Sequence, residues 1–153
     1  MPEESEPFLK FEPVYQKRVW GGRTLESRFR RKLPDNDSPF GESWEISARE
    51  EADCVVASGS RSGMSLTKLW ADPDLRSAIF GPKAPDLDRF PLLCKILDAR
   101  EKLSVQVHPP ADKAEELGGE PKTEAWFIAD ADPGAKIYVG VRKGVTPESF
   151  RKA

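Results

Sequence analysis

Short apolar runs divide this chain into segments typical of strands rather than of long helices. Residues 44–49 and 54–59 are short strand candidates separated by a charged turn, which predicts a hairpin. Residues 90–97 are almost continuously apolar, as expected of a strand buried on both faces. Fourteen prolines and eleven glycines separate such runs. The pattern therefore predicts a mainly β architecture with short helical insertions.

A second alternating run, at residues 102–109, reads Lys-Leu-Ser-Val-Gln-Val-His-Pro. Because successive strand side chains point to opposite faces, Ser104, Gln106 and His108 share one face and three apolar residues share the other. Such a polar face can line a metal or sugar site inside a barrel. It can equally be an ordinary solvated face.

Two further strands are expected after this run. In residues 122–129, Glu124 shares a face with two apolar side chains. Residues 136–141 form the second strand, and the Asp-Pro-Gly at 132–134 is typical of a turn. The two segments together predict another hairpin.

Helix signals appear at three places. Residues 65–81 predict a helical insert with Ser65 as N-cap and Gly81 as its end. Residues 111–117 can form one or two helical turns. Thr146 followed by proline begins another helix, which the sequence allows only about two turns, so we expect the chain to be cut rather than finished.

The N-terminal segment carries two smaller expectations. Residues 1–7 are acidic and polar, which predicts a disordered lead-in before an ordered domain at 8–153. Residues 20–25, Trp-Gly-Gly-Arg-Thr-Leu, predict a turn with an anchoring indole.

The charge and the cysteine content exclude several classes of protein. The 24 Lys and Arg nearly balance the 26 Asp and Glu among 153 residues, for a net charge of −2, and the signs are interspersed. No basic stripe predicts nucleic-acid binding, and no apolar run predicts a membrane span or a secretory signal. Two cysteines, Cys54 and Cys94, in a chain without a secretory signal favour a reduced, cytoplasmic protein, and their spacing does not indicate a metal site.

Two features suggest chemistry from residue type alone. Gln106, His108 and Glu124 could supply three zinc ligands from neighbouring strands, although glutamine is an uncommon ligand and one histidine is few. Lys95 interrupts the apolar run at 90–97 and either extends to an edge or faces a polar cavity. Residue type alone decides neither question.

The order and spacing of several motifs resemble a known family. Residues 90–99 read Phe-Pro-Leu-Leu-Cys-Lys-Ile-Leu-Asp-Ala, residues 103–109 read Leu-Ser-Val-Gln-Val-His-Pro, and residues 122–126 read Lys-Thr-Glu-Ala-Trp. Supporting motifs stand at 20–22, 41–47 and 134–140. From about Phe8 onward, the chain resembles the N-terminal half of type I phosphomannose isomerases.

This resemblance implies a cupin-type jelly-roll β-barrel, incomplete here, that holds one zinc ion. It also implies the reversible conversion of mannose 6-phosphate to fructose 6-phosphate. The family's metal ligands match Gln106, His108 and Glu124. Its substrate-binding residues match Lys95, Ser104 and Lys122, and Lys122 is also the expected catalytic residue.

The chain departs from the family pattern in one respect. The family's second histidine ligand and a catalytic arginine lie downstream, whereas His108 is the only histidine among these 153 residues. Three interpretations follow. The chain is the N-terminal part of a zinc-dependent isomerase, a half-cupin that binds metal or sugar phosphate without turnover, or a structural fragment. Open sheet edges would let the half-cupin complete its sheets as a homo-oligomer.

Overall fold

The computed structural model describes residues 8–153, so the predicted lead-in at 1–7 lies outside the described residues. The chain divides into two compact units, the first ending at Val105 and the second running from Gln106 to Ala153. The elements, in chain order, are β1 (Val14–Gly22), α1 (Thr24–Ser27), β2 (Phe40–Ile46), β3 (Ala48–Arg49), β4 (Ala52–Asp53), α2 (Leu66–Ala71), α3 (Pro73–Phe80), β5 (Cys94–Leu97) and α4 (Pro147–Lys152).

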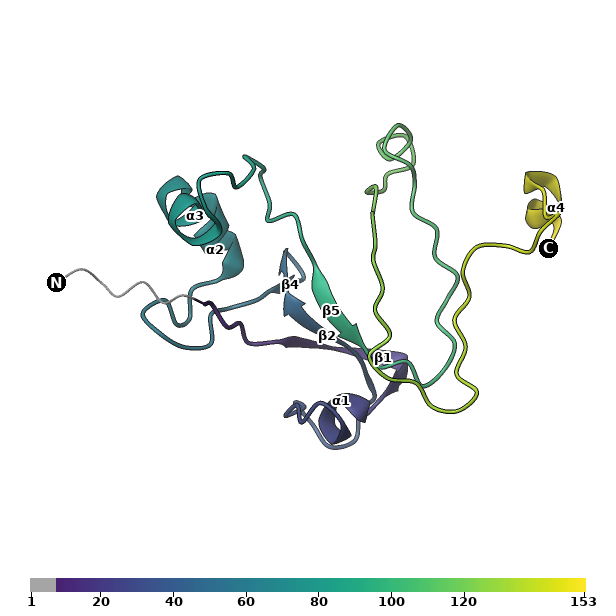
Figure 1. Ribbon diagram of the computed structural model, residues 1–153, viewed down its shortest axis with the longest axis horizontal. Helices are drawn as coiled ribbons and strands as arrows, with labels where there is room; N and C mark the ends of the chain where they lie inside the picture. The colour runs from purple at the N-terminus through teal and green to yellow at the C-terminus, as the bar shows by residue number, and fades with distance from the viewer. Residues whose placement is uncertain (1–7) are drawn as a thin grey trace. The chain divides into compact units, whose positions relative to one another are not determined.

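An antiparallel sheet with the order β1-β2-β5 organises the first unit (Figure 1). The turn predicted at residues 20–25 begins only after Gly22, and the Trp-Gly-Gly at 20–22 forms the end of β1. The reason is a close approach between backbones. A Cβ on Gly21 would lie 2.6 Å from the carbonyl carbon of Phe40, so glycine allows β1 and β2 to meet at this point.

One face of this sheet covers a small apolar core. Leu25, Leu33 and Phe40 are buried there, and Tyr15 and Ile96 pack against them. The rings of Tyr15 and Phe40 meet edge to face, with centroids 6.1 Å apart. Strands β1, β2 and β5 and the segment around α1 therefore share one core.

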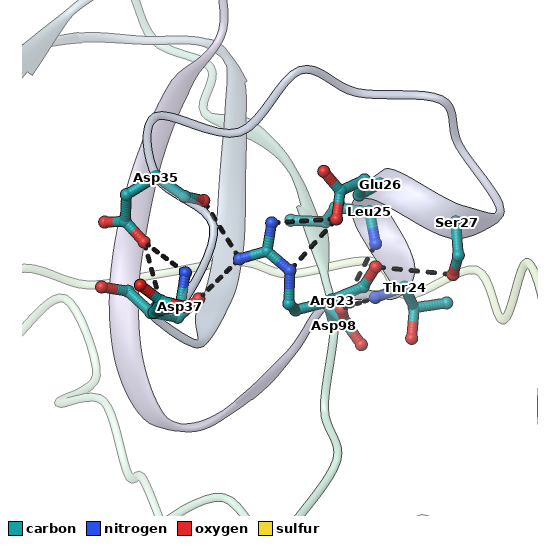
Figure 2. Close-up of polar contacts among 9 residues, drawn as sticks. Arg23, Thr24, Leu25, Glu26, Ser27, Asp35, Asp37 and Asp98 are labelled. Carbon is teal, nitrogen blue, oxygen red and sulfur yellow. Dashed lines mark hydrogen bonds and ion pairs between the residues drawn. The ribbon is translucent and has the colours of Figure 1, made fainter.

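Helix α1 is held by a carboxylate from a distant part of the sequence. The N-cap residue, Arg23, makes no side-chain capping bond. Instead, the backbone N–H groups of Thr24 and Leu25 both donate to Oδ2 of Asp98, which directly follows β5 (Figure 2). Asp98 is 8% exposed and satisfies helix donors that would otherwise lack a partner.

The Arg23 side chain ties the same helix to the following loop. Its guanidinium donates to Oε2 of Glu26 and to the backbone carbonyls of Asp35 and Ser38 (Figure 2). Because the guanidinium fork is planar, these bonds fix α1 and the loop in one orientation.

We expect Asp98→Ala to lower the free energy of unfolding by about 1–3 kcal/mol, because it leaves two helix N–H groups near the core without their acceptor. Urea denaturation of the chain measures this loss. Asp98→Asn keeps one acceptor oxygen and should cost less. The control is Asp86→Ala, since Asp86 pairs with Arg76 while its own side chain is 94% exposed. Equal losses for Asp98→Ala and Asp86→Ala would refute this role.

The predicted helical insert at 65–81 is confirmed, as two helices. Ser65 accepts a bond from the backbone of Lys68 at the start of α2, and Asp72 caps α3, which ends at Gly81 with a φ of 89°. Figure 1 shows α2 and α3 side by side. The indole of Trp70 joins them to the next loop through a 2.7 Å bond to the carbonyl of Leu87.

Two strand predictions in the first unit need correction. The hairpin expected from 44–49 and 54–59 is formed instead by the short strands β3 and β4. The expected doubly buried strand at 90–97 is reduced to β5, which lies at an edge of the sheet. Leu92 is 66% exposed and Cys94 is also exposed, so this segment is not buried on both faces.

The second unit is largely irregular. The strands predicted at 102–109, 122–129 and 136–141 are absent from the described residues, where these segments are not paired as strands. A strand requires a neighbour for its backbone groups, and alternation alone does not supply one. The turn at 132–134 is confirmed by a bond from the Ala135 N–H to the carbonyl of Asp132.

Turns rather than a helix occupy residues 111–118. Helix α4 begins as predicted at the Thr146 cap, where Thr146 and Ser149 form a reciprocal capping box. Across the described residues, the fold is mainly sheet with a few short helices, and its strands do not close into a barrel. No helix in residues 8–153 is both long and apolar enough to cross a membrane.

Candidate metal and substrate site

Three of the predicted site residues meet in the second unit, around the carboxylate of Glu124. The ammonium of Lys122 lies 3.1 Å from Glu124 Oε1. Nε2 of His108 lies 3.9 Å from Glu124 Oε2. These side chains are about one-third exposed, so the cluster is open to small solutes. His108 and Glu124, 16 residues apart in the sequence, therefore lie close together although neither belongs to a strand.

The His108 side chain has a buried nitrogen atom that lacks a hydrogen-bond partner in the described part of the chain. Its Nε2 is inaccessible to solvent and has no hydrogen-bond partner among the described residues. A buried polar nitrogen without a partner is costly, and such atoms frequently mark a missing ion or water. An imidazole nitrogen and a carboxylate oxygen are both good zinc ligands, and two bonds of about 2.0–2.2 Å each can span their separation. The two groups therefore fit a metal ion.

The described residues do not supply a complete ligand set of the usual kind. No group of three His, Cys, Asp or Glu side chains in residues 8–153 is arranged to hold a metal. The third ligand predicted from the sequence is the amide of Gln106, two residues before His108 in the same unit. Its role as a ligand stays a prediction.

The other two predicted substrate residues belong to the first unit. Lys95 lies on β5 and its ammonium donates to Glu42 Oε1 at 3.0 Å. Ser104 is exposed near the end of the unit. Lys95 and Ser104 belong to the first unit and Glu124 to the second, so the place of these residues in one pocket with Lys122 stays a prediction.

The sequence interpretation did not select Glu42, because a carboxylate of this kind is usually solvated or structural. In the structure it is buried and bonded to Lys95, Arg18 and the indole of Trp44. Alternation places Glu42 and Trp44 on one face of β2, and Lys95 stands opposite Trp44 on β5. Glu42 could have been identified as a partner of Lys95 only if the pairing of β2 with β5 had been known.

The burial of Glu42 shapes its ionisation. Desolvation alone would raise the pKa of this carboxyl. Hydrogen bonds from Lys95 and Trp44 and the charges of Lys95 and Arg18 outweigh that effect, so the pKa of Glu42 lies below its ordinary value. The group is therefore an anion at neutral pH.

Comparison with protein families gives a match over most of the chain. Residues 8–132 match the family described as phosphomannose isomerase type I, catalytic domain. The matched span contains all six of the site residues predicted from the sequence.

Individual relatives agree with this match. The chain is 39% identical over 146 residues to the probable mannose-6-phosphate isomerase GmuF of Bacillus subtilis, covering 94% of this chain and 44% of that protein. It is 41% identical over 134 residues to the mannose-6-phosphate isomerase ManA of the same organism, covering 86% of this chain and 40% of ManA.

A solved structure is similar as well. A crystal structure of the mannose 6-phosphate isomerase from Bacillus subtilis superposes with a TM-score of 0.63 at 37% identity, covering 74% of this chain and 34% of that one. The chain thus spans less than half the length of the relatives it matches.

Proposed function

The chain belongs to the type I phosphomannose isomerase family, and from this premise we propose that it forms the N-terminal part of a zinc-dependent isomerase. The reaction interconverts mannose 6-phosphate and fructose 6-phosphate. The observation that carries the proposal is the Nε2 of His108, which is buried, has no hydrogen-bond partner within residues 8–153 and lies 3.9 Å from Glu124 Oε2. Sequence identity of about 40% to proteins named mannose-6-phosphate isomerases supports the same reaction.

In this proposal Gln106, His108 and Glu124 hold the zinc. The metal, when bound, supplies a Lewis acid that polarises sugar oxygens and stabilises negative charge during proton transfer between adjacent carbons. Glutamine and neutral histidine carry no charge, so Glu124 is the one anionic ligand of the three. The set leaves the centre positively charged and suited to an anionic substrate.

Lys122 has two roles in the proposed site. Its ammonium lies 3.1 Å from Glu124 Oε1, which restricts the orientation of that carboxylate. An ammonium has three donors, so the same group can also contact a sugar oxygen and stabilise charge that develops there. We therefore assign Lys122 as the catalytic residue. Lys95 and Ser104 are assigned to substrate binding, with Lys95 as a point charge for the phosphate.

The proposed architecture is a cupin-type jelly roll to which this chain contributes the first strands. In the described sheet, β1 and β5 are the edge strands, and edge strands can pair with a further strand. In the proposal, downstream segments cover these edges, or a second copy does so in a homo-oligomer. The free thiols of Cys54 and Cys94 support a reducing, cytoplasmic location.

A second candidate function is binding of metal or sugar phosphate without turnover. It is favoured by one observation, that His108 is the only histidine among these 153 residues. Under this alternative Gln106, His108 and Glu124 still bind the metal, but the protein does not catalyse isomerisation.

One preparation of the complete protein, assayed twice, separates these functions. Elemental analysis gives zinc per chain, and a coupled assay gives the rate of mannose 6-phosphate isomerisation. We expect about one zinc per chain together with turnover. Zinc without turnover would support the binding module instead, and a preparation with neither would leave the chain as a structural fragment.

A further inference from the structure

A charged cluster crosses all three strands of the main sheet. Arg18 lies on β1, Glu42 and Trp44 on β2, and Lys95 on β5. Glu42 Oε2 accepts from Arg18 Nη2 at 2.8 Å and from Trp44 Nε1 at 3.1 Å, while Oε1 accepts from Lys95 Nζ at 3.0 Å. Both carboxylate oxygens are thus engaged, and the Glu42 side chain is only 8% exposed.

The partners of Glu42 are more exposed than Glu42 itself. The Lys95 side chain is 22% exposed and that of Arg18 is 37% exposed. Two cations and one anion leave the cluster with a net charge of +1. A buried carboxylate beneath partly exposed cations is an arrangement that fixes those cations in place while a positive charge stays available to an anion.

Lys95 is held from two directions. Besides the bond to Glu42, its ammonium lies 5.6 Å from the centroid of the Trp44 ring, within the range of a cation–π contact. An unrestrained lysine has many rotamers and loses that freedom when it binds a ligand. A lysine already fixed by its surroundings loses less, which strengthens binding. An ammonium has three donors, so the Glu42 bond is compatible with a phosphate contact.

We propose that Glu42 is a positioning residue for substrate binding, which fixes the Lys95 ammonium where Lys95 meets the phosphate of the sugar. This inference rests on the proposed function, since it takes the role of Lys95 from there. Arg18 donates to the other carboxylate oxygen of Glu42. This second bond holds the carboxylate in place, so Glu42 in turn restricts the movement of the Lys95 ammonium. The specificity for a phosphorylated sugar thus depends on a side chain that does not contact the substrate.

The test compares Glu42→Gln with the control Glu45→Gln. Glu45 is a neighbouring carboxylate on β2 that bonds Arg31 and Ser43 and not Lys95. Calorimetry measures mannose 6-phosphate binding to the complete protein, and steady-state kinetics separates KM from kcat. We expect Glu42→Gln to weaken binding and raise KM about fivefold to tenfold, with kcat changed less than about twofold. Glu45→Gln should leave both values unchanged.

A double-mutant cycle makes the result specific to Lys95. Lys95→Met alone should weaken binding at least as much as Glu42→Gln, and adding Glu42→Gln to Lys95→Met should have no further effect. Glu42→Asp, which retains the charge, should recover part of the affinity. Additive losses in the cycle, unchanged binding in Glu42→Gln, or a wild-type protein that binds no mannose 6-phosphate would each overturn the inference.

Stability and turnover are read separately. Circular dichroism at the assay temperature shows whether each variant is folded, and Glu42→Asp replaces Glu42→Gln in the cycle if the latter unfolds. A wild-type protein that binds mannose 6-phosphate but does not isomerise it would refute the proposed reaction. In that case the double-mutant cycle of Glu42 and Lys95, measured by binding alone, would still test the positioning role.

Discussion

His108→Ala is expected to abolish isomerisation, with a loss of at least about 1,000-fold in kcat/KM, and to remove bound zinc from the complete protein. The expected loss is large because, in the proposed function, a bound metal would stabilise the charge that develops in the transition state, and losing a single stabilising donor already costs a factor of about 100 to 1,000. The physical basis is the Nε2 atom that lies buried opposite Glu124. Zinc content and the coupled assay measure the two effects on the same sample.

The matched control for His108→Ala is Lys113→Ala in the same unit. Lys113 forms an exposed ion pair with Glu116, and its side chain is 53% exposed. Such pairs contribute little, so this variant should retain zinc and activity. A His108→Ala protein that keeps one zinc per chain would show that the metal is held elsewhere.

Gly21→Ala is expected to lower the free energy of unfolding by about 3 kcal/mol, the upper end of the usual cost of overpacking. The added Cβ would lie 2.6 Å from the carbonyl carbon of Phe40 and nearer still to the backbone nitrogen of Gly41. Backbone atoms cannot rotate away as a side chain can, so β1 and β2 must separate. Urea denaturation of the chain measures the loss.

A control on the same strand isolates this steric effect. Val19 is 93% exposed, so Val19→Ala removes strand-favouring bulk without creating a clash. Its cost should be at most about 1 kcal/mol. If Gly21→Ala were no more destabilising than Val19→Ala, the close approach of β1 and β2 would not be required for folding.

The helices could be predicted because their signals are local. Ser65, Gly81 and Thr146 each act through bonds to residues within four positions or through their own backbone angles, and all three mark helix ends in the structure. Strand pairing is not local in this sense. The alternation at 102–109 is correct as a pattern, but a strand also needs a neighbouring strand, and this segment is not a strand in the structure.

The residues of the candidate site also differ in how far the sequence could predict them. The proximity of His108 and Glu124 followed from a family pattern, since residue type alone left the metal open. Glu42 could not be found without the register that places Trp44 opposite Lys95. A lysine in an apolar run was a visible signal, but its anionic partner lies 53 residues away in the sequence. Long-range pairs of this kind require the topology first.

Zinc K-edge X-ray absorption on the zinc-loaded chain tests the central claim most directly. The account predicts nitrogen and oxygen ligands at about 2.0–2.2 Å, with scattering from one imidazole that disappears in His108→Ala. A shell of sulfur at about 2.3 Å would assign the metal to Cys54 or Cys94 instead, and a chain that retains no zinc would contradict the site altogether.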